Sequence, residues 1–385
     1  MLDVFFGGLL FHPAALDYSD ETCSHGCAYC FANINKAYRE GDLAGAIKRL
    51  WRKDDTTLTG RLIREGYPIC VSNRTDGFAR NNVRNTRALF QHLAEKDNGV
   101  FIQTKGGEGI GEIIESLPRK PVIYISITML DDEIAKTVEP AAPPPSARLA
   151  LARHFIERGY VVVAAINPCN KSWLPPDHFS ELHRRFAEVG VRNVVIEMLD
   201  MGTMRMRKLS EGRVVRLVNA KSTIGQEDRQ YVRDCTHALV AAGFAVAKKG
   251  MPYSSDFYIP VEAALGKVMP SLQTWINSLF QRGPGPVALN HFLEWVARHI
   301  DLDTPVRGNA LRGYLLRNGF ETWKAHQRVD TFRDLMRIAW NDPKTHIGVQ
   351  NHSLIQPHRE NHLPVQDDQG NAVLFFNPPT QKGGD

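Results

Sequence analysis

The feature that most restricts the fold of this chain is the alternation of strand-like and helix-like segments through its first 250 residues. Two runs of mostly β-branched and other apolar residues, 122–127 and 161–166, show no alternation of polar and apolar positions. Such runs are typical of parallel strands that are covered on both faces. Helical patterns flank them at 147–159 and 177–190. The pattern therefore predicts an α/β domain, with a parallel sheet and helices packed outside it.

Three of the six cysteines, Cys23, Cys27 and Cys30, follow a C-x3-C-x2-C spacing. A secreted disulfide framework would be denser and in a shorter chain, so in a reducing compartment these thiols indicate a metal or redox site. Three thiolates on one loop can bind three irons of a four-iron cluster and leave the fourth iron open. One alternative is a zinc site, which needs four ligands and would recruit His25 from inside the loop. The other is a set of incidental thiols without a metal.

The segment C-S-H-G-C-A-Y-C-F at 23–31 resembles the cysteine motif of the radical S-adenosylmethionine superfamily, and in particular its spore photoproduct lyase-like branch. The resemblance covers about residues 17–250 and includes T-D-G-F at 75–78, T-K at 104–105, I-S-I-T at 125–128 and E-P at 139–140. It implies a partial (β/α)6 TIM-like barrel, with a [4Fe-4S] cluster and S-adenosyl-L-methionine at the carboxyl ends of the strands.

The same resemblance implies roles for individual residues. Cys23, Cys27 and Cys30 would bind the cluster. Ser72 would contact the methionyl part of S-adenosylmethionine, and Lys105 its carboxylate or ribose.

Further residues follow from the resemblance with an alternative beside each. Ser126 would lie near the ribose, although it could equally be a satisfied strand residue. Tyr29 would shield the cluster or present its backbone to the cofactor. Arg148 would clamp the cofactor carboxylate or pair with Glu139. Glu197 and Asp200 follow a strand pattern, so they would bind a ribose or a substrate, or cap the next element.

Two further cysteines are thiol candidates. Cys70 stands two positions before Ser72, so both would lie on one face of a strand. The resemblance implies a hydrogen-atom donor at such a position, whereas a buried apolar role is the commoner one for an isolated cysteine. Cys169 follows Pro168 near the end of another strand and is the second candidate.

The expected reaction is reductive cleavage of S-adenosylmethionine to a 5'-deoxyadenosyl radical, which takes hydrogen from an unidentified substrate. An external electron donor of the flavodoxin or ferredoxin type would reduce the cluster. One alternative is DNA lesion repair, for which a basic run supplies phosphate contacts: Arg205, Arg207, Lys208, Arg213 and Arg216. The other is a non-catalytic iron–sulfur or zinc protein. The net charge of +5 permits a nucleic acid but does not require one.

The chain divides into an expected radical S-adenosylmethionine core over 1–250, a mostly helical extension over 251–345 and an irregular or mobile tail over 346–385. The extension could form a cover over the substrate. No apolar run is long enough to span a bilayer, and no signal-peptide pattern opens the sequence, so a cytoplasmic protein without a membrane partner is expected.

Overall fold

The fold is described from a computed structural model of the chain. The structure describes residues 14–16, 23–30, 43–52, 63–71, 75–198, 226–247, 255–267, 272–299, 301–303, 331–341, 349–351 and 354–378.

One parallel sheet forms the centre of the described chain. Its strands lie side by side in the order in which they occur in the sequence. They are β1 (Ala14–Leu16), β2 (Ile69–Val71), β3 (Val100–Thr104), β4 (Val122–Ser126), β5 (Val162–Cys169), β6 (Asn193–Met198) and β7 (Ala245–Ala247). All neighbouring pairs run parallel. The sheet confirms the predicted α/β architecture of a partial barrel, and β7 adds a seventh strand to the six expected.

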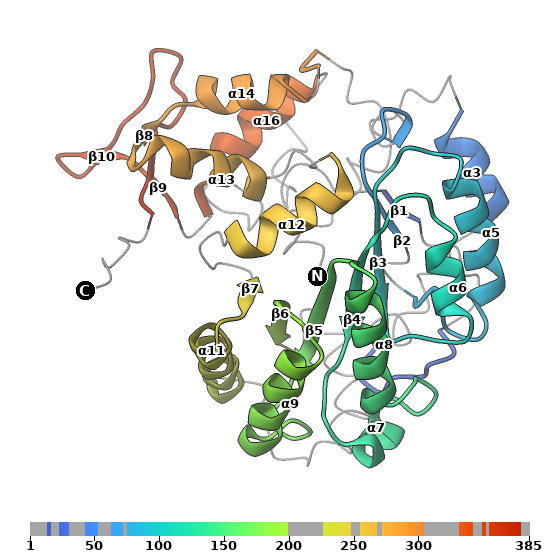
Figure 1. The fold of residues 1–385 in the computed structure, drawn as a ribbon. Coiled ribbons are helices and arrows are strands. Elements are labelled where there is room, and N and C mark those ends of the chain that lie inside the picture. The colour runs from blue at the N-terminus through green and yellow to red at the C-terminus, as the bar shows by residue number, and fades with distance from the viewer. Residues whose placement is uncertain are drawn as a thin grey trace.

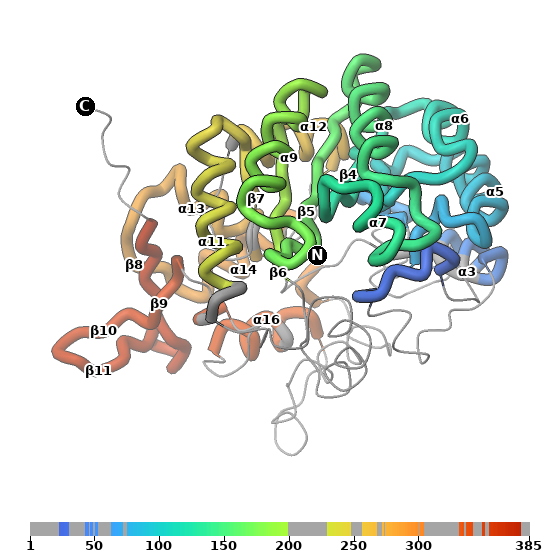
Figure 2. The backbone as a smooth tube through the Cα atoms, turned by 90° about the horizontal axis from the view of Figure 1, so that it is seen from below, coloured from blue at the N-terminus to red at the C-terminus, as the bar shows by residue number. Residues whose placement is uncertain are grey.

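Helices cover the outer face of this sheet, as Figure 1 shows. They are α3 (Leu43–Leu50), α5 (Val83–Leu93), α6 (Ile110–Glu115), α7 (Asp132–Val138), α8 (Pro145–Glu157), α9 (Pro176–Glu188) and α11 (Gln226–Ala241). In Figure 2, α11, α9, α8, α6 and α5 follow one another along the outside of the strands. Strand residues such as Ile102, Ile125 and Val194 point toward these helices and are fully buried among their apolar side chains.

The inner face of the sheet carries the alternate residues of the same strands. Phe101, Tyr124 and Val163 lie in a second apolar cluster together with α12 (Ser255–Leu265). Because side chains of a strand alternate between faces, burial of both sets explains why these strands lack a polar face in the sequence. In Figure 1, α12 lies between the sheet and the rest of the C-terminal part.

The C-terminal part combines helices with short strands. Its helices are α13 (Leu272–Arg282), α14 (Leu289–Ala297), α16 (Phe332–Asn341) and the 3-10 turn η2 (Val349–Asn351). A second sheet has the order β8 (Gly285–Val287), β12 (Leu374–Phe376), β9 (Ile355–Pro357), and a third pairs β10 (Arg359–Glu360) with β11 (Leu363–Pro364).

The expectation of an irregular or mobile tail after residue 345 is wrong over 354–378, where β9 to β12 lie. Leu374 and Phe376 are fully buried on one side of β12, and the Trp340 indole N–H donates to the Ala372 carbonyl oxygen at 2.6 Å. The tail has few apolar residues, but in β12 they alternate as a strand requires, so Leu374 and Phe376 pack in the core of the C-terminal part.

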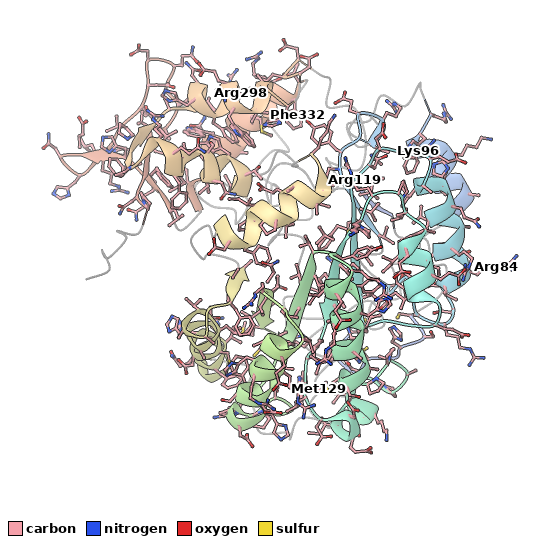
Figure 3. The ribbon with its side chains drawn as sticks, viewed as in Figure 1. Arg84, Lys96, Arg119, Met129, Arg298 and Phe332 are labelled. Carbon is pink, nitrogen blue, oxygen red and sulfur yellow. The ribbon has the colours of Figure 1, made fainter. Side chains whose placement is uncertain are left out.

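The C-terminal part packs at the edge of the main sheet where the strands begin. Figure 3 marks the two ends of β4, with Arg119 before it and Met129 after it, and Phe332 of the C-terminal part lies on the Arg119 side. The Lys267 ammonium, just after α12, donates to the carbonyl oxygen of Glu65, which precedes β2. The described part of the extension therefore leaves the opposite edge, where the strands end, uncovered. In the described residues no helix is both long and apolar enough to cross a membrane.

Glu262 in α12 gives the fold a pH dependence. Burial raises the pKa of its carboxyl from 4.5 to about 7. A raised folded-state pKa contributes stability that is complete below the unfolded pKa and is lost as the pH rises through the folded pKa. We expect Glu262→Gln to raise the free energy of unfolding by about 1–3 kcal/mol at roughly pH 8, and to change it little at roughly pH 4.

Denaturant unfolding of both proteins at the two pH values measures the effect. A Glu262→Gln stabilisation of equal size at both pH values would show that ionisation of Glu262 is not its cause.

Candidate active site at the carboxyl edge of the sheet

A short loop, 23–30, carries the three clustered cysteines. Cys23 and Cys27 are buried and Cys30 is half-buried. Two turns fold the loop: the Gly26 N–H donates to the Cys23 carbonyl oxygen at 3.3 Å, and the Cys30 N–H donates to that of Cys27 at 3.1 Å. Gly26 has φ +65°, a conformation that a glycine adopts without strain. These turns place the three cysteines on one loop, and the Ala28 N–H, which donates to the Val138 carbonyl oxygen at 2.8 Å, ties this loop to the end of α7.

Burial is the main influence on these thiols. It raises the pKa of Cys23 to about 11, with a contribution from the Asp76 charge. It raises the pKa of Cys27 to about 12, although the nearby charge of Lys105 acts in the opposite direction. Metal binding would have to supply the free energy to deprotonate them.

His25 holds the loop in place and has no ring nitrogen left for a metal. Its Nε2 lies 3.2 Å from Asp76 Oδ2, and its Nδ1 lies 3.2 Å from the Ala141 carbonyl oxygen. The backbone joins the same two segments, because the Ala141 N–H donates to the His25 carbonyl oxygen at 3.1 Å. A zinc site that takes His25 as its fourth ligand is therefore incompatible with this arrangement.

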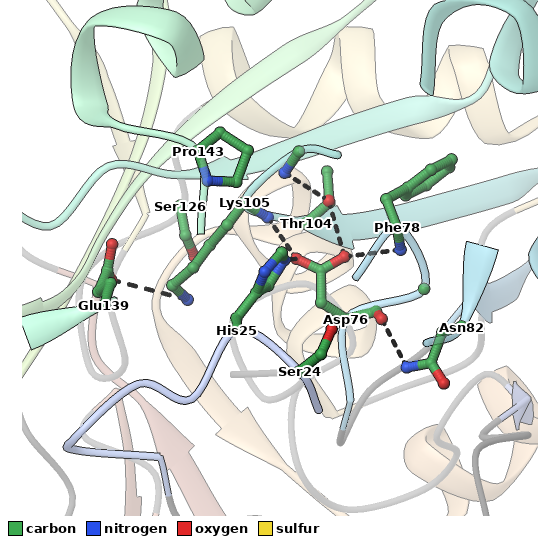
Figure 4. A network of polar contacts seen from close by, with 12 residues as sticks. Ser24, His25, Asp76, Phe78, Asn82, Thr104, Lys105, Ser126, Glu139 and Pro143 are labelled. Atoms are coloured by element: carbon green, nitrogen blue, oxygen red, sulfur yellow. Dashed lines mark hydrogen bonds and ion pairs between the residues drawn. The ribbon is translucent and has the colours of Figure 1, made fainter. Parts of the chain in front are cut away.

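Asp76 connects the cysteine loop to the end of β3, as Figure 4 shows. Its Oδ1 accepts hydrogen bonds from the Thr104 hydroxyl at 2.8 Å and from the Phe78 N–H at 2.9 Å. Its Oδ2 accepts from the Lys105 N–H at 2.6 Å and faces His25. These bonds outweigh the effect of burial and lower the pKa of Asp76. A buried carboxylate with this many donors holds the cysteine loop, the turn at 75–78 and the end of β3 in fixed positions relative to one another.

We expect Asp76→Ala to lower the free energy of unfolding by about 3 kcal/mol, because hydrogen bonds to a charged group each contribute about 1.5–3 kcal/mol. Asp76→Asn keeps one carbonyl oxygen and should cost less. Denaturant unfolding of the three proteins measures both changes. Equal midpoints for Asp76→Ala and the wild type would show that Asp76 does not stabilise the fold.

Glu139 is the second buried carboxylate of the site and lies between α7 and α8. Arg148 and the Tyr29 hydroxyl both donate to it, and the Thr128 hydroxyl donates at 3.0 Å. The Lys105 ammonium lies 4.0 Å from its Oε1. Burial favours the neutral acid, but the charges of Arg148 and Lys105 outweigh it and keep the pKa of Glu139 low.

Lys105 directly follows β3 and is placed where the sequence predicted it. Its side chain is 16% exposed, whereas that of Glu139 is completely buried. Burial alone would lower the pKa of the ammonium, but Cys27 and Glu139 raise it above its usual value. The 4.0 Å contact with Glu139 is too long for a hydrogen bond, and no other described residue accepts one from the ammonium. Within the described part of the chain, N–H donors of a charged lysine are therefore left for an anionic ligand beside Cys27.

Tyr29 links the cysteine loop to two neighbours. Its ring lies 5.6 Å from the Lys105 ammonium and stacks on Trp173 with a centroid distance of 5.8 Å. Burial and the Glu139 charge raise the pKa of its hydroxyl. Tyr29 therefore packs beside the cysteines, as a shielding role requires, with its hydroxyl committed to Glu139.

Arg148 takes the second of its two expected roles and pairs with Glu139. It has no solvent exposure, and it also donates to the carbonyl oxygens of Pro143 at 2.6 Å and Ser126 at 3.0 Å. Arg148 would therefore act on a cofactor only indirectly, by positioning Glu139 and the loop at Pro143. Ser126 is buried at the last position of β4. Contacts of Tyr29, Lys105, Ser126 and Arg148 with a cofactor stay predictions.

Several predicted residues lie outside the described residues. These are Ser72, Asp200 and the basic run Arg205, Arg207, Lys208, Arg213 and Arg216. Glu197 is described and sits next to the end of β6. The Asn167 amide donates to its Oε2 at 2.8 Å and to the Tyr124 hydroxyl at 3.4 Å. Glu197 therefore belongs to a polar group on the inner face of the sheet.

The two candidate thiols outside the loop point to different sides of the sheet. Cys70 has no exposure and lies with Phe101 and Tyr124 in the inner cluster. Its role as a hydrogen donor stays a prediction. Cys169 packs in the outer cluster with Cys235 of α11, so its thiol does not face the barrel interior.

Among the described residues, no group of three or more histidine, cysteine, aspartate or glutamate side chains converges to hold a single metal ion. A four-iron cluster makes a different demand, because each thiolate binds a separate iron. The donors in the loop fit such a cluster: three thiols are present, and the one histidine among them is occupied by Asp76 and Ala141. That set leaves one iron without a protein ligand.

Asp76 is a site residue that the sequence analysis did not single out, and Glu139 entered it only as the alternative partner of Arg148. Both lie in motifs that carried the family resemblance, T-D-G-F and E-P. Asp76 comes shortly after the end of β2, and that position was the available signal, whereas Glu139 follows helix α7.

No model of a known protein family matches the chain. An uncharacterized protein of Acidianus two-tailed virus, ORF301, is 26% identical over 202 residues, or 48% of this chain. The match spans 66% of that protein, which is less than two thirds of its length.

Two kinds of solved structure are similar to this chain. A spore photoproduct lyase complexed with a dinucleoside spore photoproduct shares 16% identity, with a TM-score of 0.43, 62% of this chain covered and 78% of the other. SuiB of Streptococcus suis bound to S-adenosylmethionine shares 13% identity, with a TM-score of 0.40, 61% of this chain covered and 46% of the other. Similarity this distant carries no information about the substrate.

Proposed function

We propose that this protein is a radical S-adenosylmethionine enzyme, with a [4Fe-4S] cluster on Cys23, Cys27 and Cys30. When bound, such a cluster supplies the electron that cleaves S-adenosylmethionine to methionine and a 5'-deoxyadenosyl radical. The observation that carries the proposal is the cysteine loop at the carboxyl edge of a parallel sheet, with its only histidine engaged elsewhere and a charged lysine beside it.

The residues around the loop have separate tasks in this proposal. Lys105, beside Cys27, would offer N–H donors to the carboxylate of S-adenosylmethionine. Glu139 keeps the Lys105 ammonium charged and in place, and Arg148 balances the remaining charge of Glu139. Tyr29 and Trp173 form an aromatic wall beside the loop, which excludes water from the cysteines.

The proposal does not specify the substrate. Asn167 and Glu197 present an amide and a carboxylate on the inner face, beyond the fully buried ring of Tyr124. Such groups bind a substrate through hydrogen bonds, and the substrate class is left to experiment.

Anaerobic reconstitution with iron and sulfide tests the proposal. We expect the reconstituted protein to form 5'-deoxyadenosine from S-adenosylmethionine only when dithionite or a reduced flavodoxin is added. No product from a cluster-loaded protein with either reductant would refute the catalytic claim and favour a non-catalytic iron–sulfur protein. Transfer of deuterium from labelled DNA, peptides or metabolites into 5'-deoxyadenosine would then identify the substrate class.

A further inference from the structure

Two cysteines that the proposed reaction does not use lie against each other on the outside of the sheet. Cys169 is the last residue of β5, and Cys235 lies in the middle of α11. The Cys169 side chain interacts with the Cys235 thiol and lowers its pKa. They are 1% and 3% exposed, and neither is in a disulfide.

An irregularity in β5 creates this contact. Ile166 points outward, so a regular strand would point Asn167 inward and Cys169 inward as well. The pairing of β5 with β6 shifts register between Ile166 and Cys169, and Cys169 packs in the outer cluster instead. A bulge of this kind re-aims a side chain, and here it turns the Cys169 thiol toward α11.

The contact joins α11 to the segment that supports the cysteine loop. The Tyr231 hydroxyl, one turn before Cys235, donates to the Leu174 carbonyl oxygen. Leu174 follows Trp173, whose ring stacks on Tyr29 between the cluster cysteines. The interaction with Cys169 outweighs burial and lowers the pKa of the Cys235 thiol, which increases the thiolate fraction of Cys235.

We propose that Cys169 and Cys235 are a redox-active pair that forms a reversible disulfide between β5 and α11. A disulfide requires the two sulfurs to approach to about 2 Å, and the outward turn of Cys169 places both thiols in the same buried cluster. The site is independent of the proposed radical chemistry, because it lies on the other face of the sheet from Cys70 and uses none of the cluster cysteines.

A peroxide is the oxidant that balances the step and is small enough to reach a buried thiol. The Cys235 sulfur attacks one peroxide oxygen, the O–O bond breaks, and one water leaves as Cys235 becomes a sulfenic acid. The Cys169 sulfur then attacks the Cys235 sulfur, the S–O bond breaks, and the second water leaves. The two thiols lose two electrons and two protons, and the peroxide gains them. Two molecules of a small thiol such as glutathione reduce the disulfide back to two thiols and are themselves joined by a disulfide.

Peptide mapping of the full-length protein tests the pair directly. Trypsin releases Cys169 in peptide 159–171 and Cys235 in peptide 234–248, and neither peptide holds another cysteine. After treatment with hydrogen peroxide we expect these two peptides to be joined, with a mass two hydrogens below their sum. Reduction with a phosphine should separate them.

Thermal unfolding supplies the second readout. A disulfide that closes a loop of this length restricts the unfolded chain, so the oxidised protein should have a Tm several degrees above that of the reduced protein. Cys235→Ser should abolish both the joined peptides and the Tm difference. Cys70→Ser is the matched control, because Cys70 is equally buried on the other face, and it should retain both.

The proposal fails if peptides 159–171 and 234–248 stay separate under peroxide that fully oxidises the half-buried Cys30, and also after prolonged exposure to oxidised glutathione just below the Tm. It also fails if either cysteine is instead linked to Cys70 or to a second chain.

Discussion

Replacing Cys27 with alanine is expected to abolish both iron binding and 5'-deoxyadenosine formation. Cys27 is the central cysteine of the loop, it is buried, and Lys105 and Glu139 surround it. A cluster held by only three thiolates has no spare protein ligand, and His25 is bound to Asp76 and Ala141. We expect the reconstituted wild type to hold about four irons per chain and Cys27→Ala to hold almost none, with a rate lower by at least about 100-fold.

Iron analysis, the visible absorbance of the cluster and the yield of 5'-deoxyadenosine measure this change. Cys235→Ala is the matched control, because it removes a buried thiol from α11 and should leave the iron content unchanged. Full iron content in Cys27→Ala would assign the cluster to other residues. Loss of iron in both variants would indicate general unfolding, which circular dichroism would reveal.

Replacing Glu139 with alanine is expected to cause the largest loss of stability in the site. The variant leaves the guanidinium of Arg148 fully buried without its carboxylate, and it removes the acceptor of Tyr29 and Thr128. Removing one partner of a buried ion pair costs about 3–5 kcal/mol, because the other charge stays buried and unpaired. We therefore expect the unfolding midpoint in denaturant to fall sharply.

Two comparisons separate this mechanism from a simple loss of side-chain volume. The double variant Glu139→Leu with Arg148→Met removes both charges and should be more stable than Glu139→Ala alone. Glu133→Gln breaks an exposed ion pair with Lys136 and should leave the midpoint close to that of the wild type. A double variant that is less stable than Glu139→Ala would show that the ion pair itself is not the source of the effect.

Much of the fold follows from local sequence patterns. The runs at 122–127 and 161–166 correspond to β4 and β5, and the helical patterns at 147–159 and 177–190 correspond to α8 and α9. These elements were predictable because apolar periodicity and β-branched residues act within a few turns of chain. The strands β9 and β12 were not predicted, because their few apolar residues become a strand pattern only against the core of α13, α14 and α16. The residues of β10 and β11 are exposed, so no apolar pattern marks that hairpin.

The candidate site was also predictable only in part from the sequence. The spacing of Cys23, Cys27 and Cys30 and the place of Lys105 after a strand are visible in the sequence. The centre of the site is not visible there, because its contacts join distant residues: Tyr29 and Glu139 are 110 positions apart, and His25 and Asp76 are 51 apart. Only the folded sheet brings such residues together, since parallel strands collect their following loops at one edge.

The cysteines illustrate how far the sequence alone predicts the structure. The sequence by itself determined that three thiols stand on one loop of a parallel α/β chain. The tertiary structure decided that His25 is committed to Asp76 and that Lys105 stands beside Cys27. It also decided that Cys169 faces Cys235 rather than the barrel, because a register shift near the end of β5 reverses the face to which a residue points.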